Sequence, residues 1–266
     1  MRSNPIAITA CPCYNDEKCE GGSLMRVLAI GNSYSQDATR YLHDIAKADG
    51  VELEVVNLYI GGCSLERHYR NMLSGEKAYN LQFDGHMTGF FVSMDDALLN
   101  RQWDVVTIQQ VSYGAPHAET YRPYAEAIAA HIRKCQPKAK LLLHQTWAYE
   151  DGCDRLKNVA GYDSAAAMLA DIKTAYTQIA AELKTDGIIP AGELMFSLTT
   201  RGIEKIHRDT FHATLGLGRY ALGLLWYRVL TGNSVTNNTF CAFDEPVSEA
   251  EMQIAKACAE VFQPIL

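Results

Sequence analysis

The sequence lacks the features that mark membrane-spanning, nucleic-acid-binding or multidomain proteins. No apolar run approaches the roughly 20 residues that a transmembrane helix needs, so no membrane partner is indicated. No cluster of Lys and Arg stands out in a chain whose formal net charge is -7, which argues against a nucleic-acid partner. The 266 residues also contain no internal repeat and no Pro/Ser-rich linker. What remains has the composition of an ordinary globular protein, with 48% hydrophobic and 21% charged residues.

Residues 1–24 differ in character from the rest of the chain. They lack the basic start, apolar core and small-residue cleavage site of a signal peptide, so a cytoplasmic location is expected by default. We expect residues 1–24 to form a leader or a loosely attached arm and residues 25–266 to form one domain. Cys11, Cys13 and Cys19 lie in this arm, but no second ligand pair follows at the spacing of a zinc site. We therefore expect no metal and no cofactor.

From Arg26 onward, strand-like apolar runs alternate with helical patterns. Most of the runs are nearly continuous and rich in Val, Ile and Leu, which is typical of strands covered on both faces. They are Val27–Ile30, Leu53–Ile60, Val105–Ile108, Leu141–His144 and Ile188–Ile189. The helical patterns are Ala38–Ala48, Tyr121–Cys135, Ser164–Leu183, Gly216–Leu230 and Ser248–Phe262. This alternation predicts an α/β fold, a three-layer α/β/α sandwich with a central parallel sheet of about five strands.

One segment breaks the alternation. Residues 78–100 are aromatic and contain glycine, and they indicate an insertion made of a loop or hairpin followed by a short helix. Ser93 and Asp96 have the spacing of a capping box, which places the start of that helix at Ser93.

Polar residues and glycines follow the predicted strands at the edge where an open parallel sheet binds its ligands. The segments are Gly31-Asn32-Ser33, Gly61-Gly62, Gln109-Gln110, Gln145-Thr146-Trp147 and Ala191-Gly192-Glu193. Near the C-terminus, Asp209 and His212 are three residues apart, so both side chains can face one way on a tight turn. A serine hydroxyl becomes a useful nucleophile only when a base takes its proton, and the base needs a partner that fixes its tautomer. Ser33, His212 and Asp209 together supply these three parts.

On these motifs the chain resembles the SGNH (GDSL-like) hydrolase superfamily, and within it a largely uncharacterised bacterial subgroup. The resemblance spans roughly residues 26–232 and implies a flavodoxin-like sandwich. It also implies a Ser-His-Asp triad in which Ser33 is the nucleophile, His212 the base and Asp209 its orienting carboxylate. The backbone N–H groups of Ser33 and Gly62 are the implied oxyanion donors.

The sequence departs from the pattern of this superfamily at two positions. Asn32 stands where the family motif has an aspartate, and the asparagine that follows the third strand is missing. A glutamine side chain can take over as an oxyanion donor, and we favour Gln110 with Gln109 as the alternative, because strand alternation sends only one of them toward the site. Ser35 is the rival serine, and we expect it to be a cap or a helix-start residue.

Three further residues are expected to line the substrate cleft: Trp147, Tyr113 and Arg67. By resemblance, the chain is expected to be a serine esterase that hydrolyses a short acyl ester, possibly an acetyl ester, on a small molecule or a carbohydrate. Its activity should fall below about pH 6.5 as the imidazole protonates. An α/β-hydrolase is disfavoured because Ser35 occupies the second glycine position of the G-x-S-x-G elbow. The alternative is a non-catalytic protein of the same fold that binds a small ligand or a sugar.

Overall fold

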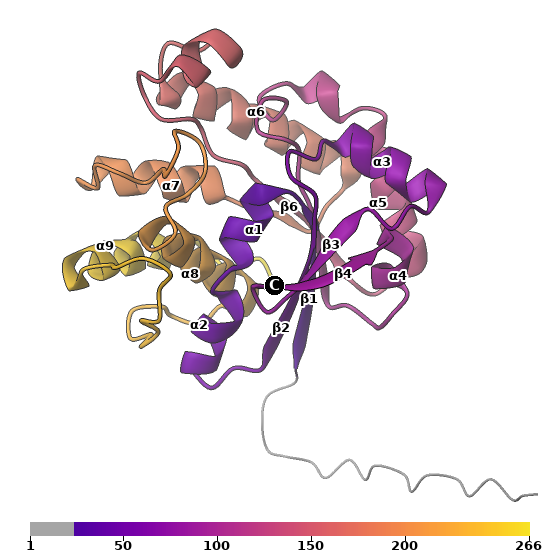
Figure 1. Ribbon diagram of the computed structural model, residues 1–266, viewed down its shortest axis with the longest axis horizontal. Helices are drawn as coiled ribbons and strands as arrows, with labels where there is room; N and C mark the ends of the chain where they lie inside the picture. The colour runs from indigo at the N-terminus through magenta and orange to yellow at the C-terminus, as the bar shows by residue number, and fades with distance from the viewer. Residues whose placement is uncertain (1–23) are drawn as a thin grey trace, which may run out of the picture.

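The computed structural model describes residues 24–266, and nearly all of the predicted N-terminal arm, with Cys11, Cys13 and Cys19, lies outside these residues. A single sheet runs through the described part of the chain in the order β4-β3-β2-β1-β5-β6-β7 (Figure 1). Its strands are β1 (Met25–Gly31), β2 (Leu53–Tyr59), β3 (Tyr79–Phe83), β4 (His86–Val92), β5 (Val105–Ile108), β6 (Lys140–His144) and β7 (Gly187–Ile189).

The five strands expected from the apolar runs are β1, β2, β5, β6 and β7, and all of them pair in parallel. The prediction of a parallel sheet is confirmed, but the sheet has seven strands where about five were expected. The insertion forms the antiparallel hairpin β3–β4, and β3 pairs with the edge of β2. Asp84 and Gly85 turn the hairpin with positive φ angles, and a carboxylate oxygen of Asp84 accepts a hydrogen bond of 2.9 Å from the backbone N–H of Val55. The turn is therefore tied to β2.

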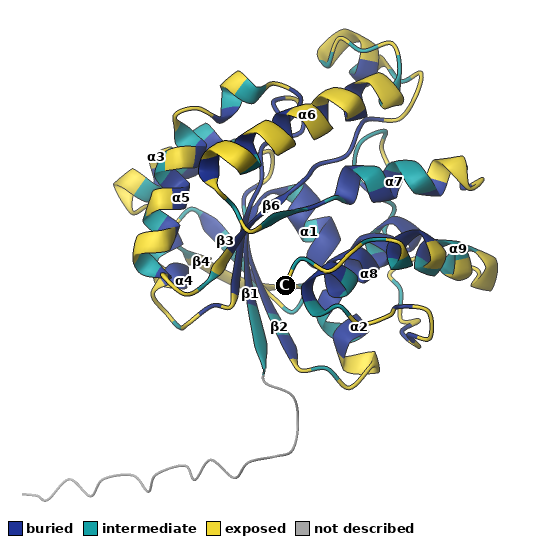
Figure 2. Cartoon of the chain, turned by 180° about the vertical axis from the view of Figure 1, so that it is seen from behind, coloured by how far each residue is buried: buried dark blue, intermediate teal, exposed yellow. Residues whose placement is uncertain are grey.

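Helices cover both faces of the sheet, and the three layers can be followed in Figure 1. One face carries α1 (Ser33–Thr39), α2 (Leu42–Ala48), α7 (Ala191–Thr200), α8 (Leu217–Thr231) and α9 (Glu249–Glu260). The other carries α3 (Leu65–Ser74), α4 (Met94–Leu98), α5 (Tyr124–Cys135) and α6 (Ala165–Leu183). Each layer encloses its own apolar core against the sheet, and the central strands β1, β2, β5 and β6 are mostly buried (Figure 2). Among residues 24–266, no helix combines the length and apolarity needed to cross a membrane.

Three features of the helices differ from the sequence-based expectation. The predicted helix over Ala38–Ala48 is two helices, because the buried Tyr41 leaves the helical path and donates its hydroxyl to the carbonyl of Leu215 at 2.6 Å. Helices α3 and α7 were not predicted. Helix α7 starts at the end of β7 and passes so close to the neighbouring strand end that a Cβ on Gly192 would lie 2.6 Å from the carbonyl oxygen of Thr146. The capping box of Ser93 and Asp96 is present at the start of α4.

Candidate active site

The turn between β1 and α1 presents Ser33 and hides Ser35. Asn32 is the N-cap of α1, and its side-chain oxygen accepts a hydrogen bond of 3.0 Å from the backbone N–H of Tyr34. Ser33 occupies the first helical position, half-buried at the end of the strand. The side chain of Ser35 points the other way and is 1% exposed, and its Oγ lies 2.8 Å from Oδ1 of Asn57. Ser35 therefore has a structural environment that a substrate cannot reach.

Ser33, His212 and Asp209 lie in one hydrogen-bonded chain. Oγ of Ser33 is 2.7 Å from Nε2 of His212, and Nδ1 of His212 is 2.7 Å from Oδ2 of Asp209. A carboxylate can only accept, so Nδ1 carries the proton, and in the neutral ring Nε2 is left to accept the serine hydroxyl. The arrangement depends on a tight turn in which Thr210 has a φ of 75° and the backbone N–H of His212 donates to Oδ1 of Asp209 at 2.9 Å.

The carboxylate of Asp209 is held in its ionised form. Partial burial alone would raise the pKa of Asp209, but the hydrogen bonds from the ring and the backbone N–H of His212 outweigh it. The net effect is a pKa below the usual value of an aspartate. An ionised Asp209 accepts the Nδ1 proton of His212 and so fixes the orientation of the imidazole.

A cleft of about 350 Å³ opens over Ser33. The residues that line it are Asn32, Ser33, Tyr34, Gln36, Tyr59, Gly61, Gly62, Val111, Ser112, Tyr113, Arg155, Arg208, Phe211 and His212. Gly62 has a φ of 61°, in the left-handed region that favours glycine, and its backbone is exposed. Among the described residues, the N–H groups of Ser33 and Gly62 have no hydrogen-bond acceptor. Both are therefore free to donate to a ligand.

A buried chain of amide and imidazole groups joins the loops that form the cleft. Nδ2 of Asn32 donates to the carbonyl of Cys63 at 3.0 Å, and Oδ1 of Asn32 accepts from Nε2 of Gln109 at 2.7 Å. Oε1 of Gln109 in turn accepts from Nδ1 of His144 at 3.0 Å. Burial lowers the pKa of His144 to about 3, so this imidazole is neutral and structural. The chain ties together the ends of β1, β5 and β6 and the loop after β2.

The prediction that a glutamine side chain donates to the oxyanion is wrong for both candidates. The amide of Gln109 belongs to the buried chain, and Gly31 leaves the space for it, since a Cβ there would lie 2.6 Å from Oε1 of Gln109. Oε1 of Gln110 accepts from the backbone N–H groups of Leu65 and Val111, at 3.0 and 2.8 Å. Its Nε2 donates to the carbonyl of Thr120 at 2.9 Å. Both glutamines satisfy buried polar groups, and neither lines the cleft.

Two of the three predicted substrate-binding residues lie outside the cleft. Trp147 is 1% exposed, because its indole stacks on Tyr34 at 4.1 Å and its Nε1 donates to the carbonyl of Phe211 at 2.8 Å. It supports the cleft wall from behind. Arg67 is exposed on α3 and is not among the residues that line the cleft. Tyr113 does line the cleft, and its side chain is 54% exposed.

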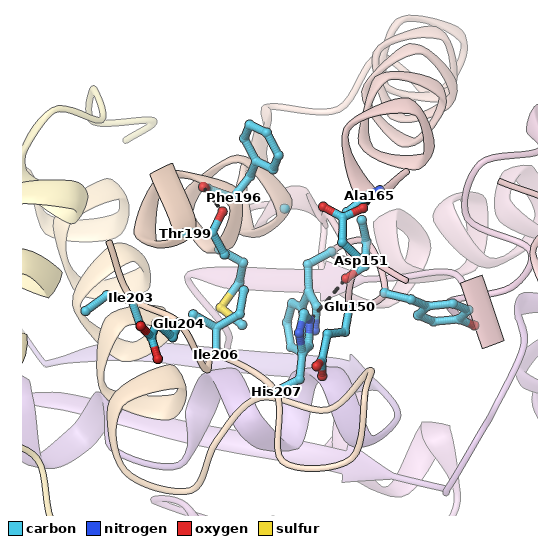
Figure 3. A pocket seen from close by; sticks show the side chains of 14 residues that line it. Glu150, Asp151, Ala165, Phe196, Thr199, Ile203, Glu204, Ile206 and His207 are labelled. Atoms are coloured by element: carbon cyan, nitrogen blue, oxygen red, sulfur yellow. Dashed lines mark hydrogen bonds between the residues drawn. The ribbon is translucent and has the colours of Figure 1, made fainter. Parts of the chain in front are cut away.

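Trp147 lines a second cavity of about 300 Å³, which shares no lining residue with the cleft over Ser33. Figure 3 shows this second cavity from close by. Met195, Phe196, Ile203 and Ile206 supply apolar walls, and Glu150, Asp151 and Glu204 supply polar ones. Nε2 of His207 lies 3.1 Å from the carbonyl of Ala148, and burial lowers the pKa of His207 to about 4. This cavity contains no serine, and His207 is held as a hydrogen-bond donor.

Sequence reasoning missed the two arginines that line the cleft and Phe211, which packs on the His212 ring with ring centroids 3.9 Å apart. Arg208 directly precedes the D-x-x-H motif and Phe211 lies within it, so their closeness to the motif was available as a signal. Arg155 begins the π-helical turn η2 (Arg155–Val159), and nothing in its local sequence marks it.

Comparison with known proteins agrees with this architecture. The structure matches that of a DUF4886 family protein from Bacteroides uniformis with a TM-score of 0.83 and 31% identity, covering 90% of this chain and 94% of the other. A candidate SGNH hydrolase from Slackia heliotrinireducens matches with a TM-score of 0.55 and 22% identity, over 77% of this chain and 98% of the other. A candidate GDSL-like lipase from Parabacteroides merdae matches with a TM-score of 0.52 and 14% identity, over 78% and 95%.

These likenesses show that the fold is that of the SGNH hydrolases. No curated protein matches the sequence. The model of one family, described as a domain of unknown function (DUF4886), matches residues 26–261. The chain therefore belongs to the DUF4886 family.

Proposed function

We propose that this protein is a serine hydrolase that cleaves esters in the cleft over Ser33. The observation that carries the proposal is the hydrogen-bonded chain from Ser33 Oγ through His212 to the ionised Asp209. Such an arrangement rarely arises by chance, because it requires the end of strand β1 and a turn almost 180 residues later to meet. A protein that only binds a ligand has no need of it.

In the proposed reaction, Oγ of Ser33 attacks the carbonyl carbon of the ester while Nε2 of His212 takes the hydroxyl proton. The negative charge that develops on the carbonyl oxygen is stabilised by the N–H groups of Ser33 and Gly62. When the tetrahedral intermediate collapses, His212 returns the proton to the leaving alcohol and Ser33 keeps the acyl group. A water molecule then attacks the acyl carbon while His212 takes its proton. The bond from the acyl carbon to Ser33 Oγ breaks, His212 returns the proton to Oγ, and the acid is released.

The oxyanion site of this proposal has two backbone donors and no side-chain donor. One such donor is typically worth about 10²–10³ in turnover, so the loss of a third is a real cost. The position of Gly62 is set by the contact of Asn32 with the next residue, Cys63. The buried chain behind the cleft therefore compensates in part, because it holds one of the two remaining donors in place.

The substrate side of the proposal rests on the expectation set by the SGNH resemblance: a short acyl group, such as acetyl, on a small alcohol or sugar. A cleft of about 350 Å³ has room for a small ester. The competing hypothesis of a non-catalytic ligand-binding protein makes no use of the proton path from Ser33 to Asp209, and we place it second.

The test uses 4-nitrophenyl acetate and a fluorophosphonate probe. We expect the wild-type protein to release nitrophenol and to take up the probe at Ser33, and Ser33→Ala to lose both. Ser197→Ala is the matched control, because Ser197 lies on α7 away from the cleft and its hydroxyl donates to the carbonyl of Leu194. The hydrolase proposal is refuted if Ser33→Ala retains full turnover, or if the folded wild-type protein hydrolyses no ester in a panel of short acyl substrates.

A further inference from the structure

The charge of the cleft is opposite to that of the protein as a whole. The chain carries a formal net charge of -7, yet among the described residues no Asp or Glu lines the cleft. Two arginines are, Arg155 and Arg208. The second cavity shows the contrast, because three carboxylates line it and no lysine or arginine does. A cationic lining that runs against the overall charge is informative about the ligand.

The guanidinium of Arg155 lies over Phe211, in the turn that carries Asp209 and His212, and has no anionic partner among residues 24–266. Its guanidinium carbon lies 4.0 Å from the ring centroid of Phe211, and the Phe211 ring packs in turn on the His212 imidazole. The Phe211 ring therefore lies between the Arg155 cation and the imidazole of His212. Within residues 24–266, no carboxylate makes an ion pair with Arg155, and its guanidinium donates no hydrogen bond. Its five N–H donors therefore remain available to a ligand.

Arg208 differs, because its charge is already shared. Its Nη1 lies 2.9 Å from Oδ2 of the fully buried Asp37, which also binds Arg219. Arg219 and Arg40 both pair with Asp244. Three guanidinium groups therefore share two carboxylates in this network. The network fixes the position of Arg208, whereas the N–H donors of Arg155 have no partner among the described residues.

We propose that the cleft recognises esters that carry an anionic group, a carboxylate or a phosphate, and that Arg155 binds this group while Ser33 attacks the ester. A guanidinium pairs with such anions through two parallel N–H···O bonds, which would orient the substrate as well as hold it. This inference rests on the proposed esterase function and adds the charge of the substrate to it. Arg208 contributes electrostatic attraction from a fixed position.

The test compares matched esters that differ in charge. One pair, 4-acetoxybenzoate and 4-acetoxybenzamide, carries or lacks the charge on the alcohol. The other pair, mono-4-nitrophenyl adipate and 4-nitrophenyl hexanoate, carries or lacks it on the acyl chain. The enzymes are the wild type, Arg155→Met, Arg155→Lys, and Arg201→Gln as a control at an exposed arginine outside the cleft. Methionine keeps an unbranched side chain against Phe211 while removing the charge.

We expect the wild type to favour the charged member of one pair, and that pair identifies the side of the ester that carries the anion. Arg155→Met should lose about 10- to 100-fold of kcat/KM for the charged ester, the range for a charge-assisted hydrogen bond. The neutral ester should change little, Arg155→Lys should recover part of the preference, and Arg201→Gln should match the wild type. Absence of any charge preference in the wild type overturns the inference, as does an equal loss on both members of a pair in Arg155→Met, which would mean that Arg155 only supports Phe211.

A binding measurement separates this inference from the esterase proposal. Calorimetry with the Ser33→Ala protein and 4-acetoxybenzoate needs no turnover, and the double variant with Arg155→Met reports the contribution of the guanidinium. If no ester is hydrolysed but the anion binds and Arg155→Met removes the binding, the anion site stands and the esterase proposal fails. If esters are hydrolysed but neither anionic ester is preferred or bound through Arg155, the esterase proposal stands and the anion site fails.

Discussion

The contact between Asn32 and Cys63 can be tested by the exchange of one heavy atom, the side-chain nitrogen for an oxygen, in Asn32→Asp. The side chain of Asn32 is 1% exposed and makes three hydrogen bonds. It accepts from Tyr34 N–H and from Gln109 Nε2, and it donates to the carbonyl of Cys63. An aspartate keeps the two accepting contacts. It replaces the third by two oxygens facing each other at about the former distance of 3.0 Å.

The cost of this change follows from the burial of the site. Leaving a buried polar group without its partner costs about 1–3 kcal/mol, and more when one group is charged. In a protein of this size, 1 kcal/mol lowers Tm by roughly 2–4 °C, so Asn32→Asp should lower Tm by about 5 °C or more. The carboxyl can restore the lost donor only by taking up a proton, so the deficit should shrink as the pH falls.

The functional effect should exceed the loss of stability. Repulsion of the Cys63 carbonyl moves the loop that carries Gly62, and a misplacement of about 1 Å near the reacting atoms can cost 10²-fold in rate. We expect kcat for 4-nitrophenyl acetate to fall at least tenfold, measured well below the Tm of the variant. The control is Asn233→Asp, at an exposed site outside the cleft, where the side-chain amide donates to the hydroxyl of Tyr227. Wild-type kcat and Tm in Asn32→Asp would refute the assigned role of this contact.

Acid should destabilise the fold, because burial lowers the pKa of three histidines far below the ordinary value of about 6.5, to about 3 or about 4 (His68, His144 and His207). Below pH 6.5 the unfolded chain takes up protons on these histidines and the folded chain does not. Urea unfolding should therefore show the free energy of unfolding falling between pH 6.5 and 4, at up to about 4 kcal/mol per pH unit. A free energy that stays constant over this range would contradict the burial of the three histidines. Asp209→Asn should leave Tm nearly unchanged, because the Asp209 side chain is 45% exposed. In a steady-state assay its kcat should fall about 10²–10⁴-fold, because the imidazole loses its orienting charge. An unchanged kcat would exclude the triad. Gly31→Ala should cost about 1–3 kcal/mol in thermal unfolding, since its Cβ would lie 2.5 Å from Ser35 Oγ and 2.6 Å from Gln109 Oε1, and a wild-type Tm would show that the buried amides can shift.

Periodicity was sufficient to predict the parallel part of the sheet but not its edge. The five parallel strands are buried on both faces, so their runs are continuous and apolar and stand out in the sequence. Strand β4 is largely exposed and carries Phe90 and Phe91 on the surface, so it lacks the alternation by which a half-buried strand is recognised. The separation of α1 from α2 depends on a tertiary contact of Tyr41 that local pattern does not contain.

The same distinction applies to the site. Ser33 was found because it ends a strand, and Asp209 and His212 because their spacing on a turn is itself a signal. Gln109 and Gln110 have equal polarity at a strand end, and only the packed structure shows that both serve buried backbone and side-chain groups. Arg155 reaches the cleft from an irregular π-helical turn that no periodicity describes.

The stacked pair of Tyr34 and Trp147 forms a partition between the cleft and the neighbouring cavity, since one ring lines the cleft and the other lines the cavity. Removing that partition would join two short compartments into a single elongated channel leading away from the reacting serine. The chain length that an enzyme of this architecture accepts would then depend on the size of two side chains, and relatives could move between short and long substrates without altering the catalytic turn.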